Sequence, residues 1–133
     1  MQKMKIVLVE PLKSPKVIEI DHELKIMQSV VGGDIACTYP WPDLAGLIYA
    51  DDGIALGYPL NRMLKDEDGK VYDVIHGTFF IAGLTEDSFG SLSDELAEKF
   101  VSLFRYPEMY MRTMDGHVLC FKLGSSEEPM QIA

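Results

Sequence analysis

The sequence has few cysteines, few basic residues and no hydrophobic run long enough to cross a membrane. Two cysteines among 133 residues do not make a disulfide scaffold, and both lie in apolar segments, so we predict free core cysteines. The chain has 12 Lys and Arg residues and 21 Asp and Glu residues, so the net charge is −9. No basic stripe is visible, so direct nucleic-acid binding is not expected. The apolar stretch at residues 4–9 is far shorter than a span, which predicts a cytoplasmic protein without membrane contact.

The overall composition of the chain is that of a globular protein. Hydrophobic residues make up 47% of the chain and charged residues 25%, which separates it from disordered sequences. A chain of this length forms one domain of ordinary size. We predict a single α+β domain over residues 1–123 and a flexible polar tail over residues 124–133.

The first third of the chain predicts two strands and a helix. Residues 5–9 are rich in β-branched side chains and residues 16–20 alternate, so both favour strands. Apolar residues recur at helical spacing over residues 22–31, with Asp21 as a plausible N-cap. Gly32 and Gly33 follow and predict the helix end, because glycine adopts the left-handed C-cap conformation readily. We expect this helix to cover a sheet that contains both strands.

The rest of the chain predicts further strands and a second helix. A turn at Asp51-Asp52-Gly53 indicates a hairpin between residues 47–50 and 54–56. Residues 78–82 are the most β-prone run and are expected to join the first sheet. Ser91 or Ser93 begins a second helix, and residues 110–122 form a C-terminal hairpin. The predicted fold class is therefore α+β, with a mixed or mainly antiparallel sheet, two helices and that hairpin.

Familiar catalytic and metal-binding motifs are not found in the sequence. Gly32-Gly33 follows a helix, whereas a phosphate loop precedes one. No pair of histidines or cysteines has zinc spacing, no calcium loop is complete, and no serine lies in a nucleophile elbow. We therefore expect no metal, no cofactor and no catalytic residues, and consider an enzyme the less favoured class.

The strongest candidate for a binding site is the Asn61-Arg62 pair. Arg62 is the only arginine before position 105 and is close in sequence to several acidic residues. A guanidinium is a rigid donor fork for a carboxylate or phosphate, and an amide both donates and accepts. Two interpretations stay open: a polar anchor for a ligand or partner, or a structural ion pair with Asp66, Asp68 or Asp73.

Aromatic and imidazole side chains lie near this pair in the sequence. Tyr72 and Tyr58 offer stacking surfaces, and Trp41 offers an apolar wall. His76 precedes Gly77 in the loop before the apolar run and is the histidine most suited to a pocket. The predicted ligand- or partner-binding residues are Asn61, Arg62, Tyr72 and His76, and Gly77 joins the two earlier glycines as a structural turn.

Several of these segments resemble the family of small prokaryotic proteins known as domain of unknown function 3846. The resemblance covers about residues 4–85. It rests on the opening strand with Val9-Glu10-Pro11, on Met27-Gln28-Ser29-Val30-Val31-Gly32-Gly33, on Asp51-Asp52-Gly53 with Leu60-Asn61-Arg62, and on Ile75-His76-Gly77-Thr78-Phe79. It implies a bacterial, phage or mobile-element origin and no established activity, so it assigns no catalytic residue.

The favoured function is that of a non-enzymatic binding or accessory protein, which sequesters a small ligand or occupies a host protein. One alternative is an antirestriction-like DNA mimic, which requires an acidic ridge. The other is a small enzyme, which requires Arg62, His76 and an acid to meet in a cleft.

Overall fold

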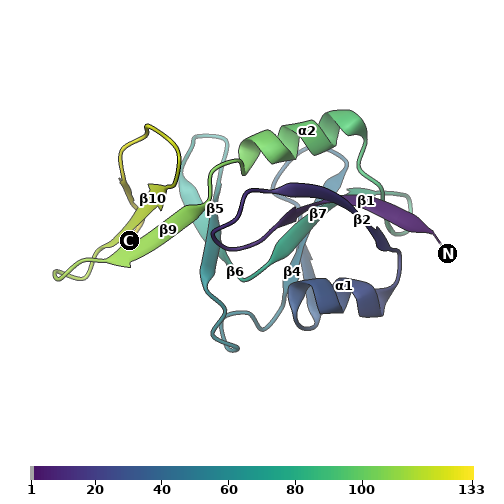
Figure 1. Ribbon diagram of the computed structural model, residues 1–133, viewed down its shortest axis with the longest axis horizontal. Helices are drawn as coiled ribbons and strands as arrows, with labels where there is room; N and C mark the ends of the chain where they lie inside the picture. Colours follow the sequence, from purple (N-terminus) through teal and green to yellow (C-terminus); the bar gives the residue numbers. More distant parts are fainter. Residues whose placement is uncertain (1) are drawn as a thin grey trace.

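A six-stranded antiparallel sheet forms the centre of the computed structural model, which describes residues 2–133 (Figure 1). The strands run in the order β2-β1-β7-β4-β3, and β8 pairs with β7. Their bounds are β1 Lys3–Val9, β2 Lys16–Asp21, β3 Ile35–Thr38, β4 Ala45–Ala50, β7 Phe79–Leu84 and β8 Phe89–Gly90. Because β7 enters between β1 and β4, strands from distant parts of the chain become neighbours.

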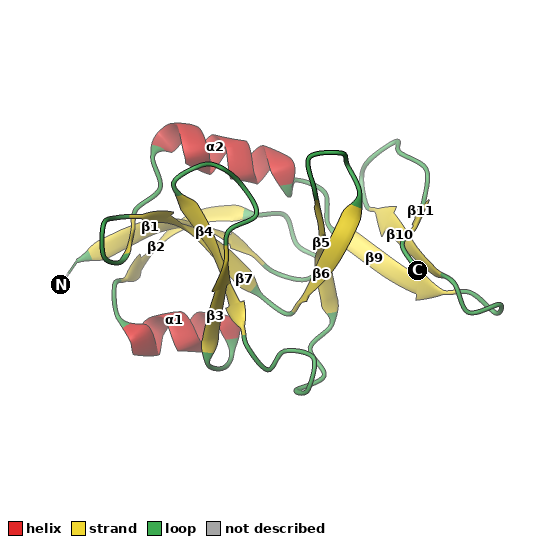
Figure 2. Cartoon of the chain, turned by 180° about the vertical axis from the view of Figure 1, so that it is seen from behind, coloured by secondary structure: helices red, strands yellow, loops and turns green. Residues whose placement is uncertain are grey.

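The two helices cover opposite faces of this sheet (Figure 2). α1, Leu24–Val31, packs on one face, where Ile6, Ile48 and Phe80 point. α2, Asp94–Leu103, packs on the other face. The hairpin of β5, Leu60–Lys65, and β6, Val71–His76, contributes to that second core as well. The predicted sheet shared by residues 5–9, 16–20 and 78–82, covered by the first helix, is therefore confirmed.

A separate three-stranded antiparallel sheet ends the chain. β9, Glu108–Arg112, pairs with β10, Val118–Lys122, and β10 also pairs with β11, Met130–Gln131. The sequence predicts a loose tail from residue 124, and the structure places part of that tail in β11. Figure 1 shows this sheet at the end of the molecule away from the N-terminus, next to the β5–β6 hairpin.

The helix ends show which sequence signals are used. α1 begins at Leu24 rather than residue 22, because Asp21 is the last residue of β2 and pairs with Lys3 instead of capping the helix. Gly32 is its left-handed C-cap, with φ +80°, as predicted. Ser93 caps α2 by accepting a hydrogen bond from the Leu96 amide. Among residues 2–133, no helix has the length and apolar character needed to span a membrane.

The hairpin predicted around Asp51-Asp52-Gly53 is wrong. β4 pairs with β3 over residues 47–50 on one edge and with β7 over residues 45–48 on the other, so a hairpin with residues 54–56 would compete with strands that are already paired. Residues 51–57 instead form consecutive turns, in which the Gly53 amide donates to the Ala50 carbonyl and the Leu56 amide to the Asp52 carbonyl. This turn segment leads to β5 and lies against β6.

Candidate functional site

The Asn61 and Arg62 side chains are fully buried, each with an exposed fraction of 0%. The Asn61 amide donates to the carbonyls of Val9 and Gly77, at 2.9 and 2.8 Å. The Arg62 guanidinium donates to the carbonyls of Phe104 and Lys13, and to Asn61 Oδ1 at 2.8 Å. These two residues therefore tie β5 to β1, to the loop after β1 and to the end of α2.

The ion pair proposed between Arg62 and Asp66, Asp68 or Asp73 does not form. Among residues 2–133, no ion pair includes Arg62. Asp66 Oδ1 instead accepts from two amides of its own turn. Burial lowers the pKa of the Arg62 guanidinium, and the negative charge of Glu108 opposes that shift. In this structure the guanidinium therefore donates to oxygen atoms inside the protein and is not accessible to a ligand at the surface.

Tyr58 brings two of the family-like segments together. Its hydroxyl donates to the Gly32 carbonyl, and its carbonyl lies 3.0 Å from His76 Nδ1. A Cβ atom at Gly32 would lie 2.7 Å from the Tyr58 hydroxyl, and one at Gly77 would lie 2.8 Å from the Tyr58 ring. Both glycines have positive φ, so their backbone conformation and this close approach each favour glycine. Two of the predicted turn residues, Gly32 and Gly77, therefore allow Tyr58 to pack closely against the backbone.

A cavity of about 210 Å³ is lined by His76, the residue whose ring contacts the Tyr58 carbonyl. It is enclosed by the end of β4, the turn segment after β4 and the last four residues of β6. Its polar side chains are those of Tyr49, Asp51, Asp73 and His76. Gly53 allows the turn segment to approach β6, because a Cβ there would lie 3.0 Å from the His76 carbonyl. Two distant segments, residues 49–54 and 73–76, therefore converge on one small cavity, which we call the Asp51–Asp73 pocket.

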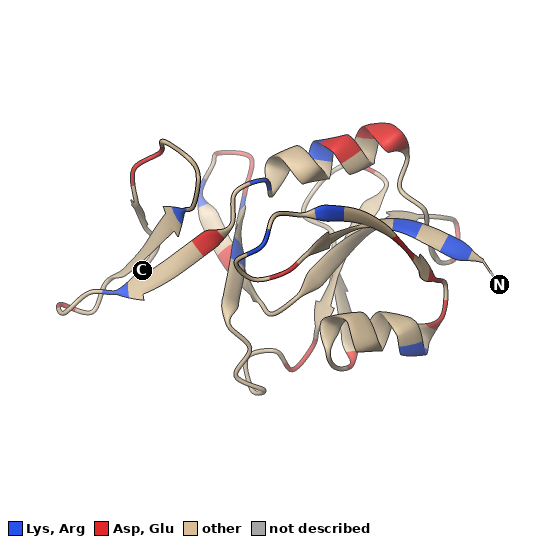
Figure 3. Cartoon of the chain, viewed as in Figure 1, with Lys and Arg blue, Asp and Glu red and all other residues tan. Residues whose placement is uncertain are grey.

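The Asp51–Asp73 pocket is electronegative. Burial raises the pKa of the Tyr49 phenol, and the negative charges of Asp73 and Asp51 raise it further. Among residues 2–133, neither of these aspartates takes part in an ion pair. Elsewhere, several acids pair with lysines, and Figure 3 shows both lysines and acids on β2 and α2, and lysines on β1. The paired acids are Glu10, Asp21, Asp43, Asp94 and Glu127.

Exposed apolar side chains lie at the pocket and next to it in the sequence. Ile54, which lines the pocket at the turn, is 76% exposed, and Tyr72, which precedes Asp73 on β6, is 53% exposed. Asp73 follows Tyr72 on β6, and its charge raises the pKa of the Tyr72 phenol in addition to the effect of burial. A cationic group with an apolar flank would find both complementary charge and apolar contact here.

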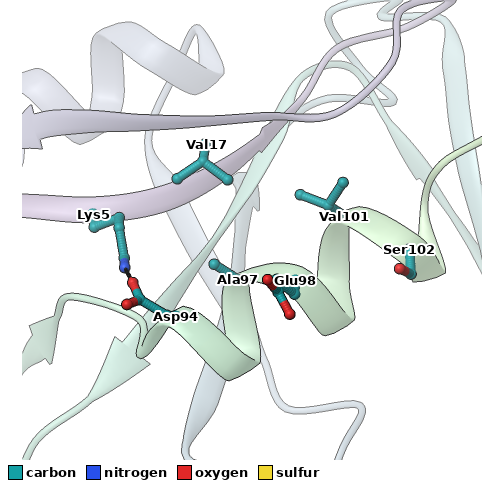
Figure 4. A pocket seen from close by; sticks show the side chains of 7 residues that line it. All are labelled: Lys5, Val17, Asp94, Ala97, Glu98, Val101 and Ser102. Carbon is teal, nitrogen blue, oxygen red and sulfur yellow. Dashed lines mark hydrogen bonds and ion pairs between the residues drawn. The ribbon is translucent and has the colours of Figure 1, made fainter.

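A larger and more open cavity of about 630 Å³ lies between β1, β2 and α2 (Figure 4). Its lining is mainly small and apolar, with Val17, Ala97 and Val101. Its one lysine, Lys5, is already paired with Asp94, as the dashed line in Figure 4 shows. Size alone therefore favours this cavity, where Glu98 is the one acid outside the ion pairs of residues 2–133, whereas the two unpaired acids favour the Asp51–Asp73 pocket. We give more weight to charge, because a few convergent polar groups orient and select a ligand.

The structure separates the four predicted binding residues. His76 lines the Asp51–Asp73 pocket and Tyr72 lies on the same strand, whereas Asn61 and Arg62 are interior residues. Sequence reasoning missed Tyr49, Asp51 and Asp73 as members of a site. The Asp51-Asp52-Gly53 motif is a visible signal, but it resembles a solvated turn until β6 is placed beside it. Among residues 2–133, no group of histidines, cysteines and acids is placed to hold a metal ion.

The fold is thus an α+β sandwich with a central antiparallel sheet. The family-like segments 27–33 and 75–79 meet at Tyr58, and segments 51–53 and 75–79 contribute to the Asp51–Asp73 pocket. A family model described as Domain of unknown function (DUF3846) matches residues 4–105, which is most of the chain. The protein belongs to this family. Neither the comparison with curated proteins nor the comparison with solved structures found a significant match. The matched region ends before β9, so the C-terminal sheet lies outside it.

Proposed function

We propose that this protein is a binding protein that holds a cationic group, such as a guanidinium or an amine, in the Asp51–Asp73 pocket. The group belongs either to a small ligand or to a side chain of a host protein. The protein then acts by occupying its partner rather than by changing it chemically.

One observation carries this proposal. Two aspartates without a basic partner face the same cavity, next to the Tyr49 phenol, in a wall that Tyr58 and two positive-φ glycines hold in place. A cation placed there gains charge-assisted hydrogen bonds and removes the repulsion between the carboxylates. The exposed side chain of Ile54, at the turn that lines the pocket, gives the flank of such a ligand an apolar contact surface.

The test is an NMR titration of the whole chain with Nα-acetyl-arginine amide. Nα-acetyl-citrulline amide is the matched probe, because it has nearly the same shape without the charge. We expect the arginine probe to shift the amide signals of residues 51–54 and 73–76, and the citrulline probe to leave them unchanged. The variant with Asp51→Asn and Asp73→Asn should lose the response.

Glu98→Gln is the control variant, because it removes an acid from the larger cavity beside α2. This variant should respond as the original protein does. Equal shifts from both probes, or arginine-dependent shifts around α2 instead of β6, would show that the Asp51–Asp73 pocket is not the cation site. An acidic ridge acting as a DNA mimic would give a third pattern, in which the double aspartate variant leaves binding to a DNA-binding protein intact.

A further inference from the structure

The β5–β6 hairpin is a two-stranded sheet, and among residues 2–133 no further strand pairs with either outer edge. β6 pairs with β5 on one side, and no other strand among residues 2–133 pairs with it. Its other edge runs beside the Asp51–Asp73 pocket, since residues 73–76 line that cavity. An open edge presents backbone donors and acceptors to any extended chain that can reach them.

The register identifies the backbone groups on this edge. Met63 and Val74 are opposite each other in the antiparallel ladder. The Met63 amide donates to Glu108 Oε1, and the Val74 amide donates to Asp73 Oδ1, each at 2.8 Å. Neither amide donates to the other strand, so this is a non-hydrogen-bonded pair, and the Val74 amide and carbonyl both point away from β5.

The two outward amides are protected in different ways. The Met63 amide is covered by Glu108, a residue that is 5% exposed and belongs to β9. The Val74 amide has only the exposed carboxylate of its own neighbour, Asp73. A carbonyl from an added strand can replace that carboxylate without breaking any contact between elements. The exchange would also release Asp73 Oδ1 toward the pocket.

We propose that the partner is an extended polypeptide segment that adds to the open edge of β6 at Val74 and places an arginine or lysine side chain in the Asp51–Asp73 pocket. This inference rests on the proposed function, because it uses the same pocket for the cation. Charge complementarity selects the basic side chain, and strand addition supplies the main-chain hydrogen bonds. The side chains next to the basic residue point to the opposite face of the added strand, whereas those two positions away share the face of the basic residue.

Strand addition to β6 is tested with the full chain and a blocked pentapeptide of sequence Thr-Val-Arg-Val-Thr. Two matched peptides accompany it: one with citrulline in place of arginine, and one with both valines N-methylated. N-methylation removes donors needed for strand pairing and keeps the charge. We expect the parent peptide to protect the Val74 amide from hydrogen exchange, and each altered peptide to bind about tenfold or more weakly.

A protein variant gives an independent reading. Val74→Pro removes the outward donor and no ladder hydrogen bond, so it is compatible with an edge strand and should bind the peptide weakly while remaining folded. If it does not fold, the N-methylated peptide still decides the question. If the N-methylated peptide binds as tightly as the parent peptide while the citrulline peptide binds more weakly, strand addition is overturned and the cation pocket is supported. Equal affinity for the arginine and citrulline peptides would refute the cation pocket itself.

Discussion

Arg62 is a buried cation that is satisfied by carbonyl oxygens rather than by a carboxylate. Arg62→Ala should destabilise the protein by about 3–5 kcal/mol, as when one member of a buried charged network is removed. The loss would leave the carbonyls of Phe104 and Lys13 without these donors. Urea denaturation measures the effect. Arg105→Ala is the control, because Arg105 is exposed, and it should change the free energy of unfolding little.

Adjacent glycines provide a second test at the residue scale. Gly32→Ala should cost about 1–2 kcal/mol, because φ is positive there and the new Cβ would meet the Tyr58 hydroxyl. Gly33→Ala should be nearly neutral, since φ is not in the left-handed region and the nearest side-chain atom would lie 3.7 Å away. Adding Tyr58→Phe should recover part of the loss at Gly32. Equal thermal melts for the two single variants would contradict this account.

At the scale of elements, β9 is attached to β5 through a buried carboxylate. Glu108 Oε1 accepts from both the Met63 amide and the Tyr110 hydroxyl, so one group joins the two sheets. Burial raises the pKa of the Tyr110 phenol above its ordinary 10.0, and the hydrogen bond to Glu108 raises it further. The folded protein therefore keeps this phenol protonated at a pH where an unfolded chain loses the proton.

The pH dependence follows from that shift. Below about pH 10 the phenol is protonated in both states, and its contribution to stability is complete. As the pH rises further, the unfolded chain loses the proton first, so the free energy of unfolding falls by about 1.4 kcal/mol per pH unit for this group. Tyr110→Phe should lack that part of the alkaline decline. The free energy of unfolding is measured by urea denaturation between pH 9 and 11. The same decline with pH in the original protein and in Tyr110→Phe would refute the assignment to Tyr110.

The positions of the strands in the sequence could be predicted better than the segments with which they pair or make contact. Local β propensity identified β1 and β7, alternation identified β2, and the glycine pair identified the end of α1. The partners of Asn61 and Arg62 could not be predicted, because they are carbonyls of Val9, Lys13, Gly77 and Phe104, and every residue type carries a carbonyl. The hairpin after β4 failed for a related reason: a turn signal does not show that β3 and β7 already occupy both edges.

At the scale of the whole molecule, one sheet separates two hydrophobic cores. Phe79 faces the α2 core and Phe80 faces the α1 core, and both are fully buried. Because the same strands carry both cores, we expect one cooperative transition. Phe80→Ala should cost about 3–5 kcal/mol. It should also shift the unfolding midpoint of Trp41, which packs on Phe100 at 4.4 Å between ring centroids, although Trp41 lies in the other core.

Circular dichroism and Trp41 fluorescence on the same variant measure this coupling, and Phe79→Ala is the matched change on the opposite face. Coincident midpoints by both probes support a single cooperative unit that includes both helices. A Trp41 transition that stays at its original midpoint in Phe80→Ala would show that the two cores unfold separately.

The sequence by itself determined the α+β class, the negative charge, the main strands and the end of α1, because these depend on composition and on local periodicity. Only the tertiary structure decided that Arg62 is interior, that Tyr58 lies against Gly32 and Gly77, and that Asp51 and Asp73 face one cavity. The physical reason is the same in each case. Burial, close approach and electrostatic coupling depend on which distant segments the sheet order makes neighbours, and no local pattern records that order.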